Sequence, residues 1–210
     1  MKNKTEKYQQ ALTIKILLVP VLTIIAQLPT MLLTSKFKEP YWKTILVVIA
    51  SALVIAFLIC ILQKVQRFTT KKLNAQSWLM IIIATSFIVI INKILLPFFQ
   101  TTGNANVKAE LGVLHNTPVL FMIYALVVAP IIEELLFRGY LLNVFFPKTP
   151  WLGIVFSATI FGLLHISTDP IYFFSKFILG ILLGMVYEKT KNIKASIIVH
   201  LLNNLSALVI

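Results

Sequence analysis

Seven apolar blocks, each 16 to 25 residues long, dominate this sequence. A helix needs about 20 residues to cross the hydrocarbon core of a bilayer, so blocks of this length predict transmembrane helices. The connectors between them are short and contain neither a Ser/Gly linker nor an internal repeat, and we expect one membrane domain over residues 1–210. The predicted fold class is all-α, a polytopic transmembrane helical bundle of about seven spans (six to eight). The predicted spans are 12–34, 42–63, 78–97, 118–142, 151–167, 171–187 and 195–210.

The composition excludes an ordinary soluble domain. Only 12% of the residues are charged and 59% are hydrophobic, whereas a soluble domain carries about 25% charged residues. The net charge of +12 would suit a nucleic-acid partner, but the positive residues lie between apolar blocks and form no basic stripe with aromatic residues. We therefore expect a lipid bilayer as the partner and no nucleic acid. The single cysteine, Cys60, lies inside an apolar block, which excludes a disulfide framework and a thiolate metal cluster.

The charges of the connectors predict an orientation. Twelve lysines and arginines lie on the side of the N-terminal tail and four lysines on the other side. Because positive residues concentrate on the cytoplasmic side, the N-terminus is expected in the cytoplasm, and seven spans would place the C-terminus outside. Lys36, Lys38 and Lys43 of the first connector disagree with this pattern. An early segment that only dips into the bilayer would change the span count by one. The first block lacks a small-residue cleavage site and is expected to be retained.

Charged residues interrupt the apolar fourth block in "EELLFRG" (Glu133–Gly139). Glu134 and Arg138 are four residues apart, so they share one helical face and can pair. Glu133 lies about 100° further round the helix and has no local partner. A charge at the bilayer centre costs roughly 2.5–3.5 kcal/mol, and pairing with arginine relieves only Glu134. Glu133 is therefore a candidate for exchanging protons in a low-dielectric surrounding, as a general base must.

Two further polar pairs lie on later blocks. In "FGLLH" Phe161 and His165 are four residues apart, and in "HLLNN" the same spacing separates His200 from Asn204. Each polar residue alone could make an interhelical hydrogen bond, worth about 0.6 kcal/mol on average. Their joint presence in one small protein favours a common site. Glutamate, two histidines and asparagine can hold a water, accept its proton and donate hydrogen bonds to an oxyanion.

These three stretches resemble the signatures EExxxR, FxxxH and HxxxN of the CAAX-protease and bacteriocin-processing (CPBP, or Abi) family of intramembrane proteases. They occur in the expected order, each on a predicted span, and the resemblance extends over about residues 118–210. The first 117 residues contribute only apolar spans to it. The resemblance implies an intramembrane endopeptidase with its site enclosed among helices. Such an enzyme hydrolyses a peptide bond in a membrane-associated peptide or a lipid-modified protein.

The resemblance also implies a role for each matching residue. Glu133 would be the general base that activates water, and His165 would help to hold that water. His200 and Asn204 would form the oxyanion hole. Asn203 lies outside the pattern and would at most support its neighbour. The residues that would support the site through their ion pair are Glu134 and Arg138.

A metal is the alternative to direct activation of water by glutamate. Glu133, His165 and His200 would make a Zn²⁺ triad with an open fourth position. However, the chain has no HExxH, the spacing that places two ligands on one helical face. The family is described both as metalloproteases and as glutamate-dependent proteases without metal. We favour the metal-free role for Glu133 and keep Zn²⁺ as the alternative cofactor.

Two features bear on how the helices meet. Gly180 and Gly184 in "LGILLG" are four residues apart, which predicts close helix packing. Lys176 is expected to extend its long stem toward the headgroups. His200 lies only about five residues inside its predicted span, so tilt or a dipping loop must bring it to the other motifs. The fourth helix must continue to about Phe146 if Glu133 is to lie as deep as His165.

The expected biological role rests on analogy with the family. The eukaryotic branch removes the last three residues of prenylated proteins, and bacterial relatives are associated with bacteriocin self-immunity and peptide maturation. A chain rich in Lys, Ile and Asn is typical of AT-rich bacteria, so we expect the bacterial cell membrane and the bacterial role. The competing reading is a non-enzymatic immunity or scaffold protein that binds a bacteriocin or another partner. A transporter would require discontinuous helices and repeat symmetry, which the sequence does not show.

Overall fold

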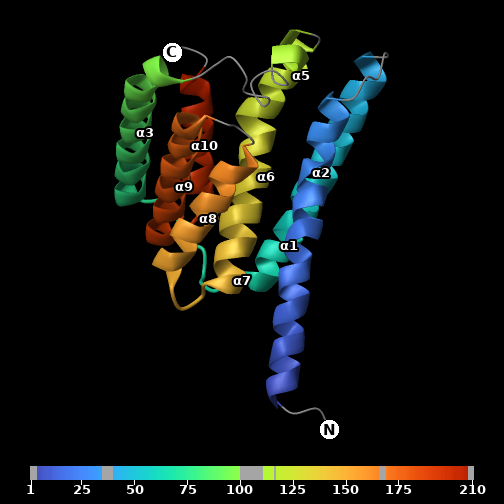
Figure 1. The fold of residues 1–210 in the computed structure, drawn as a ribbon, viewed down its shortest axis with the longest axis vertical. Helices are drawn as coiled ribbons and strands as arrows, with labels where there is room; N and C mark the ends of the chain where they lie inside the picture. Colours follow the sequence, from blue (N-terminus) through green and yellow to red (C-terminus); the bar gives the residue numbers. More distant parts are fainter. Residues whose placement is uncertain (1–3, 35–39, 100–110, 116, 166–168, 208–210) are drawn as a thin grey trace.

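The computed structural model describes residues 4–34, 40–99, 111–115, 117–165 and 169–207. All regular elements in these residues are helices and none is a strand, which confirms the predicted all-α class (Figure 1). The N-terminal elements are α1 (Lys4–Thr34), α2 (Pro40–Val65), α3 (Ala75–Leu95) and the 3₁₀ turn η1 (Leu96–Phe98). The C-terminal elements are α5 (Pro118–Ile123), η2 (Tyr124–Val128), α6 (Ala129–Glu134), η3 (Leu135–Leu142), α7 (Asn143–Phe145), α8 (Pro150–Leu164), α9 (Pro170–Thr190) and α10 (Ile193–Ser206).

Five stretches of the described residues are long and apolar enough to cross a membrane. One of them, Pro118–Phe145, joins α5, η2, α6, η3 and α7 without a break, and we call it the central helix. Helices α8 and α10 have 15 and 14 residues, so each is roughly 21–23 Å long. Each predicted span therefore corresponds to a helix, and the chain is an integral membrane protein built as a polytopic bundle. The ends of two predicted spans, 166–167 and 208–210, lie outside the described residues.

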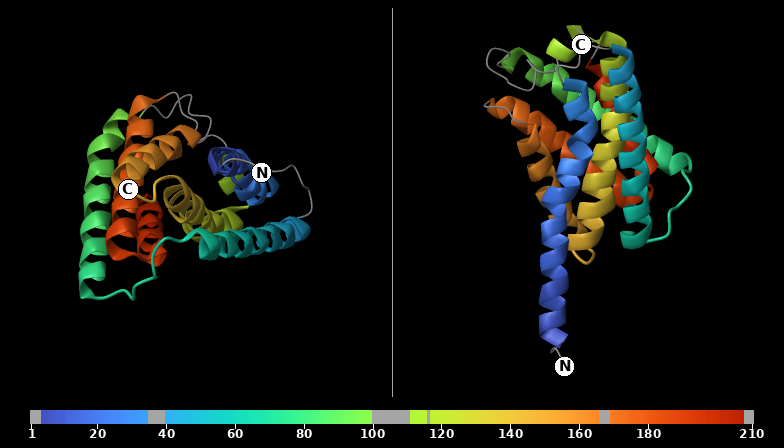
Figure 2. Two further views of the ribbon diagram at one scale, coloured as in Figure 1. Left: turned by 90° about the horizontal axis from the view of Figure 1, so that it is seen from below. Right: turned by 90° about the vertical axis from the view of Figure 1, so that its right-hand side faces the viewer.

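The central helix separates two groups of helices (Figures 1 and 2). Helices α1 and α2 pack together on one side of it, whereas α3 packs against α9 and α10 on the other. The connector 66–74 crosses the end of the molecule between the two groups. Its Lys71 donates its backbone N–H to the Lys191 carbonyl at 3.2 Å and accepts from Asn192 Nδ2 at 2.7 Å. The connector thereby leads from α2 to α3, which packs against the last two helices, α9 and α10.

The first π-helical segment of the central helix, η2, ends directly before "AP". Proline has no N–H, and its ring crowds the carbonyl four residues earlier, so a regular α-helix cannot continue through Pro130. The Ala129 N–H bonds to the Tyr124 carbonyl, five residues earlier. In the same register the donor for the Ala125 carbonyl would be Pro130, which has none. Within the described backbone, the Ala125 carbonyl is therefore left for a side-chain donor.

The second π-helical segment, η3, follows the two glutamates and carries Arg138. Asn143, just after it, donates its side-chain amide to the carbonyls of Arg138 and Gly139 at 3.0 and 2.8 Å. The same nitrogen lies 2.8 Å from the Tyr187 hydroxyl of α9. Backbone groups loosened by the wider helical turn are thus satisfied by a side chain. Segments of this kind are rare and occur frequently at functional sites.

Small residues allow α8 and α9 to pack closely. A Cβ on Gly180 would lie 2.8 Å from the Ala158 Cα atom, and one on Gly184 would lie 3.0 Å from the Ile154 side chain. No side chain fits at Gly180 without moving the backbone of α8. Without a hydrophobic force between helices in lipid, such close approach supplies much of the attraction. The predicted packing role of the two glycines is confirmed.

The structure corrects the predicted start of the last span. Helix α10 begins at Ile193, two residues earlier than predicted, because the Asn192 side chain caps it by accepting from the Lys194 N–H at 2.9 Å. His200 is therefore the eighth of 14 residues in α10 and lies at its middle. A dipping loop is not needed to bring it into the bundle. The central helix continues to Phe145, in agreement with the extension predicted from the depth of Glu133.

Candidate active site

The structure buries the ion pair of the EExxxR motif completely. Arg138 Nη1 donates to Glu134 Oε1 at 2.8 Å, and both side chains are 0% exposed. Arg138 Nη2 donates to the Gly180 carbonyl of α9 at 2.7 Å, at the point where α9 meets α8. The guanidinium therefore neutralises a carboxylate on its own helix and holds a second helix in place. The predicted pairing of Glu134 with Arg138 is present in the structure.

His200 connects the two adjacent glutamates. Its Nδ1 lies 3.2 Å from Glu134 Oε1, and its Nε2 lies 3.6 Å from Glu133 Oε2. A carboxylate can only accept, so Nδ1 carries the proton that is shared with Glu134. The opposite nitrogen then faces Glu133, which is 30% exposed, whereas Glu134 is fully buried. Two consecutive glutamates thus have different surroundings, one held within the bundle and one open to a cavity.

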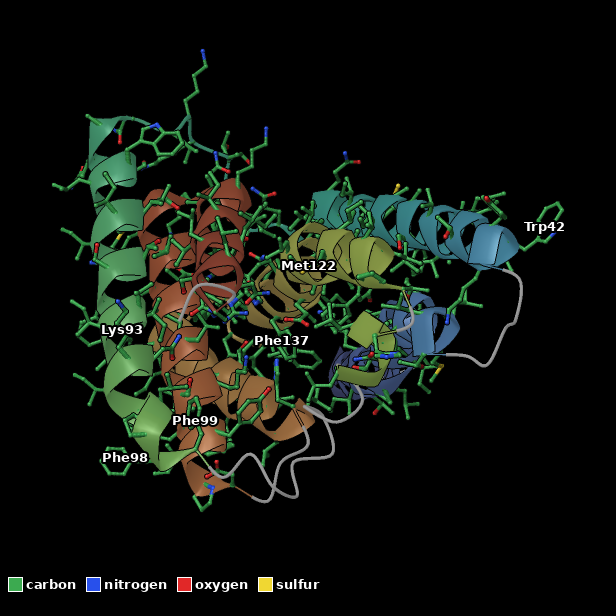
Figure 3. All side chains as sticks on the ribbon, turned by 90° about the horizontal axis from the view of Figure 1, so that it is seen from above. Trp42, Lys93, Phe98, Phe99, Met122 and Phe137 are labelled. Carbon is green, nitrogen blue, oxygen red and sulfur yellow. The ribbon has the colours of Figure 1, made fainter. Side chains whose placement is uncertain are left out.

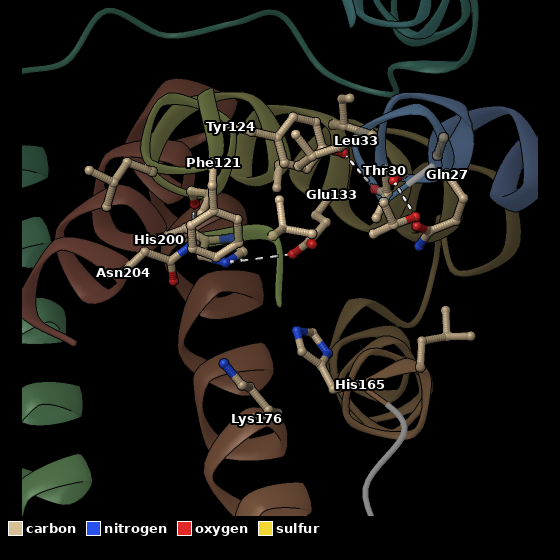
Figure 4. Close-up of a pocket in the computed structure, with 18 of the residues that line it drawn as sticks. Gln27, Thr30, Leu33, Phe121, Tyr124, Glu133, His165, Lys176, His200 and Asn204 are labelled. Atoms are coloured by element: carbon tan, nitrogen blue, oxygen red, sulfur yellow. Dashed lines mark hydrogen bonds and ion pairs between the residues drawn. The ribbon is translucent and has the colours of Figure 1, made fainter. Parts of the chain in front are cut away.

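His165 ends helix α8 and lies across the cavity from Glu133 (Figure 4). Its Nδ1 is 2.7 Å from the Phe161 carbonyl, four residues earlier. Since a carbonyl can only accept, Nδ1 carries the proton and Nε2 keeps its lone pair. That lone pair can accept a hydrogen bond from a water. The tautomer of His165 is fixed by the backbone of the helix that carries it.

The phenylalanine of the FxxxH motif packs under both histidines. Phe161 is 0% exposed, and its ring centroid lies 4.5 Å from the His165 ring and 5.8 Å from the His200 ring. The Arg138 guanidinium lies 5.3 Å from the same centroid, a distance at which a cation is attracted to a ring face. One apolar side chain thereby separates the buried ion pair from the cavity and fixes two imidazole rings.

Asn204 binds the Ala125 carbonyl, which has no backbone donor in the first π-helical segment. Its Nδ2 donates to the Ala125 carbonyl at 2.9 Å. The contact joins α10 to the central helix two turns before Glu133. One N–H of the amide remains for a ligand, because a carboxamide has two donor hydrogens. The proline of "VVAPIIEE" therefore contributes indirectly to the placement of Asn204.

A cavity of about 500 Å³ brings the motif residues together (Figure 4). Glu133, His165, His200 and Asn204 all line it, whereas Glu134 and Arg138 are buried behind it. Helix α1 forms the wall of the cavity that faces the motif-bearing helices. Polar residues of that wall and of the rim include Thr23, Gln27, Thr30, Thr34, Tyr124 and Lys176. The lining of the cavity thus mixes polar and apolar side chains.

Several residues of the cavity escaped the sequence analysis. Lys176, expected to extend toward the headgroups, lines the cavity beside His165 (Figure 4). Tyr124 and Thr30 join the central helix to α1 by a hydrogen bond of 2.7 Å between their hydroxyls. Thr30 lies in an apolar block outside the motifs, and nothing in its spacing sets it apart. Lys176 did carry a signal, since it is a charged residue inside a predicted span.

The residues present do not converge as a zinc site in this arrangement. Among the described residues, no group of three or more His, Cys, Asp and Glu side chains is placed to hold a metal ion. Glu133 Oε2 lies 3.6 Å from His200 Nε2, and both histidines bond to the protein through Nδ1, so Nε2 is the nitrogen that each could offer to a metal. A bound Zn²⁺ would require the three side chains to move together.

Comparison with known proteins places most of this site in one matched region. Residues 115–206 match the family model described as "Type II CAAX prenyl endopeptidase Rce1-like". The chain is also 31% identical over 101 residues to a Bacillus subtilis (strain 168) protein named "Putative membrane peptidase YdiL". That match covers 47% of this chain and 40% of the relative, less than half of either. No solved structure matches the chain. Helices α1, α2 and α3 lie outside residues 115–206, the part that the family model matches.

Proposed function

We propose that this chain is an intramembrane endopeptidase, and the match of residues 115–206 to the Rce1-like family model supports the proposal. Its substrate would be a membrane-associated peptide or a lipid-modified protein. The observation that carries the proposal is the cavity in which Glu133, His165, His200 and Asn204 meet. Those four side chains supply a base, a water ligand and two oxyanion donors on three different helices.

In the proposed reaction Glu133 acts as the general base. The attacking water donates a hydrogen bond to Nε2 of His165, which holds the water in place without transferring a proton. Glu133 removes a proton as the water oxygen bonds to the scissile carbonyl carbon, and the carbonyl electron pair moves to its oxygen. When the tetrahedral intermediate collapses, the C–N bond breaks and the proton held by Glu133 passes to the leaving amine. The products are a carboxylic acid and an amine, and Glu133 is regenerated.

His200 and Asn204 are placed to stabilise the oxyanion. His200 Nδ1 donates to Glu134, which orients the ring with Nε2 toward the cavity, where a proton on that nitrogen would donate to the oxyanion. Asn204 supplies the second donor through the N–H that does not bind Ala125. Removing one such donor typically costs about 10²–10³-fold in kcat. The buried pair of Glu134 and Arg138 therefore acts through His200 and touches no substrate.

We further propose that the reaction needs no metal. The support is the arrangement of the described side chains, in which Glu133 Oε2 lies 3.6 Å from His200 Nε2 and no three His, Cys, Asp or Glu groups are placed together to hold an ion. If Zn²⁺ is used, its ligands would be Glu133, His165 and His200, and it would polarise the scissile carbonyl and activate water. Treating the purified protein with a chelator separates the two proposals. Loss of activity that returns with Zn²⁺ would overturn the metal-free mechanism.

The proposed setting is a bacterial cell membrane, with the N-terminus in the cytoplasm and a role in bacteriocin self-immunity or peptide maturation. Support comes from the composition of the chain and from its similarity to a Bacillus protein named as a membrane peptidase. A non-enzymatic immunity or scaffold protein would give the same association with bacteriocins. It would not require Glu133 to be ionisable.

The experiment compares three strains that are otherwise identical: wild type, a deletion, and a chromosomal Glu133→Gln variant. The termini of membrane and secreted peptides are sequenced by mass spectrometry, and each strain is challenged with bacteriocins. Termini that vanish in both the deletion and the variant support proteolysis and identify the substrate. A variant that matches the wild type, beside a deletion with a phenotype, would show that the function needs no proteolysis.

A further inference from the structure

A continuous chain of hydrogen bonds runs from α9 through α3 to the cavity. Ser175 Oγ on α9 donates to Asn92 Oδ1 on α3 at 2.9 Å. Asn92 Nδ2 donates to Asn203 Oδ1 on α10 at 2.9 Å, and Asn203 Nδ2 donates to Asn204 Oδ1 at 3.1 Å. Asn204 Nδ2 then donates to the Ala125 carbonyl at 2.9 Å. We call these four side chains the amide relay.

The end of the amide relay fixes the orientation of every amide within it. The Ala125 carbonyl can only accept, so Asn204 must present its nitrogen there and its oxygen toward Asn203. Asn203 must then present its nitrogen to Asn204 and its oxygen to Asn92. Asn92 in turn faces Ser175 with its oxygen, and the hydroxyl donates to it. A carboxamide can otherwise rotate by 180° and exchange its donor for its acceptor.

We propose that Asn92 and Asn203 are positioning residues that hold the Asn204 amide with its second N–H toward the scissile carbonyl. The inference rests on the proposed function. With Oδ1 and one N–H already bonded, Asn204 cannot turn an oxygen toward the developing oxyanion, which it would repel. Asn203 and Ser175 are buried, so the relay lies inside the bundle, where such bonds compete little with water. Only its last member reaches the cavity.

Through the amide relay, helix α3, which lies outside the residues that match the family model, takes part in the site. Asn92 lies on α3, outside residues 115–206, and α3 packs against α9 and α10 (Figure 3). A bundle that needed only helix packing would be served by apolar contacts at this place. A hydrogen-bond chain that passes through α3 and returns to the HxxxN motif instead couples α3 to the position of Asn204.

The test measures how fast cells form the peptide termini that disappear in Glu133→Gln, by isotope pulse labelling at matched protein levels. Asn204→Ala is expected to slow their formation by about 10²-fold, as for loss of an oxyanion donor. Asn92→Ala and Asn203→Ala are each expected to slow it about tenfold, because the Asn204 amide is then free to turn. Asn92→Asp keeps the size of the side chain but cannot donate to Asn203, so the loss should be at least as large.

A double variant distinguishes positioning from mere stability. Asn92→Ala in the Asn204→Ala background is expected to add less than about twofold, because the amide that the relay positions is already absent. A further tenfold loss there would show that Asn92 acts independently of Asn204 and would overturn the proposal. Ser175→Ala, which deletes one hydroxyl, is expected to slow the wild type severalfold and the Asn204→Ala protein not at all. It serves in place of Asn92→Ala if that variant accumulates poorly.

Thr85 supplies the matched control on the same face of α3, seven residues before Asn92. Thr85→Val removes a hydroxyl that has no partner among the described residues and keeps the shape of the side chain. Its rate should equal that of the wild type. If termini depend on Glu133 but form at the wild-type rate in the Asn92 variants, the relay is wrong and the proposed function stands. If no terminus depends on Glu133, the proposed function is wrong and the positioning role falls with it.

Discussion

The two parts of the molecule bury very different side chains. Among the described residues before position 100, only three polar or charged side chains are buried, namely Lys43, Ser51 and Ser77. From position 118 onward there are eleven: Glu134, Arg138, Asn143, Ser157, Asp169, Ser175, Thr190, Asn192, Ser196, His200 and Asn203. The apolar windows of α1, α2 and α3 are 17–28% buried, against 33% and 39% for the central helix and α9. The first part mainly faces lipid, whereas the second encloses polar groups.

The difference shows what a site inside a membrane requires. On α2 the side chain of Trp42 points outward, while Phe137 of the central helix points into the bundle (Figure 3). Lipid tails solvate apolar side chains well, so α1 and α2 can be apolar on nearly every face. A buried carboxylate or amide needs a partner on another helix, because lipid offers none. The helices that carry the site must therefore fit one another residue by residue, while the remaining helices only need to be apolar.

The largest effect should come from stranding a buried charge. Arg138→Ala leaves Glu134 without its cation and removes the bond to the Gly180 carbonyl. Breaking a buried pair in this way typically costs about 3–5 kcal/mol of stability. The yield of folded protein and its thermal unfolding midpoint in detergent measure the loss. Lys194→Ala, at an exposed position on α10, is the control. A normally stable Arg138→Ala protein would mean that Glu134 is solvated.

A smaller loss is expected where two backbones touch. Gly180→Ala places a Cβ 2.8 Å from the Ala158 Cα atom, and overpacking of this kind costs about 1–3 kcal/mol. The gain in helix propensity from glycine to alanine, about 1 kcal/mol, offsets only part of it. Gly112→Ala is the matched control, because nothing lies within 4 Å of a Cβ built there. Unfolding midpoints should fall for Gly180→Ala and not for Gly112→Ala; equal midpoints would show that α8 and α9 do not pack as described.

The smallest effect should come from the lipid-facing surface of the first part. Leu53 and Leu58 lie on the same helix, α2, and are 67% and 1% exposed. Leu53→Ala is expected to change the free energy of unfolding by less than about 0.5 kcal/mol, as for surface changes elsewhere. Leu58→Ala leaves a cavity and should cost about 2 kcal/mol or more. If both variants unfold alike, α2 does not pack through the face that the structure assigns to it.

The sequence predicted the features that depend on local spacing. Residues four apart share a helical face, so the pairing of Glu134 with Arg138 and the close packing at Gly180 could be predicted from spacing alone. The length of the apolar blocks predicted helices that span a bilayer, and the low charge content predicted a membrane protein. The three motifs, taken together, pointed to a single site before any contact between helices was known.

The parts that could not be predicted depend on which helices meet. Asn92 is one polar residue in an apolar block, and its role is visible only once α3 lies against α10. The wider turn before Pro130 could be suspected from the proline, but that its open carbonyl faces Asn204 depends on tertiary packing. The start of α10 was predicted too late because the capping role of Asn192 was overlooked. The position of Lys176 in the cavity likewise follows from the arrangement of α8 and α9.

The central claim is that two adjacent glutamates have separate roles, and comparing Glu133→Gln with Glu134→Gln tests it most directly. The measurement is the rate of formation of the cleaved termini, taken together with the thermal unfolding midpoint of each purified protein. Glu133→Gln should lower the rate by about 10²–10⁴-fold, the usual contribution of a general base, and leave the midpoint unchanged. Glu134→Gln should lower the midpoint, because Arg138 then remains as an unpaired buried charge. A Glu133→Gln protein that cleaves at the wild-type rate would contradict the account.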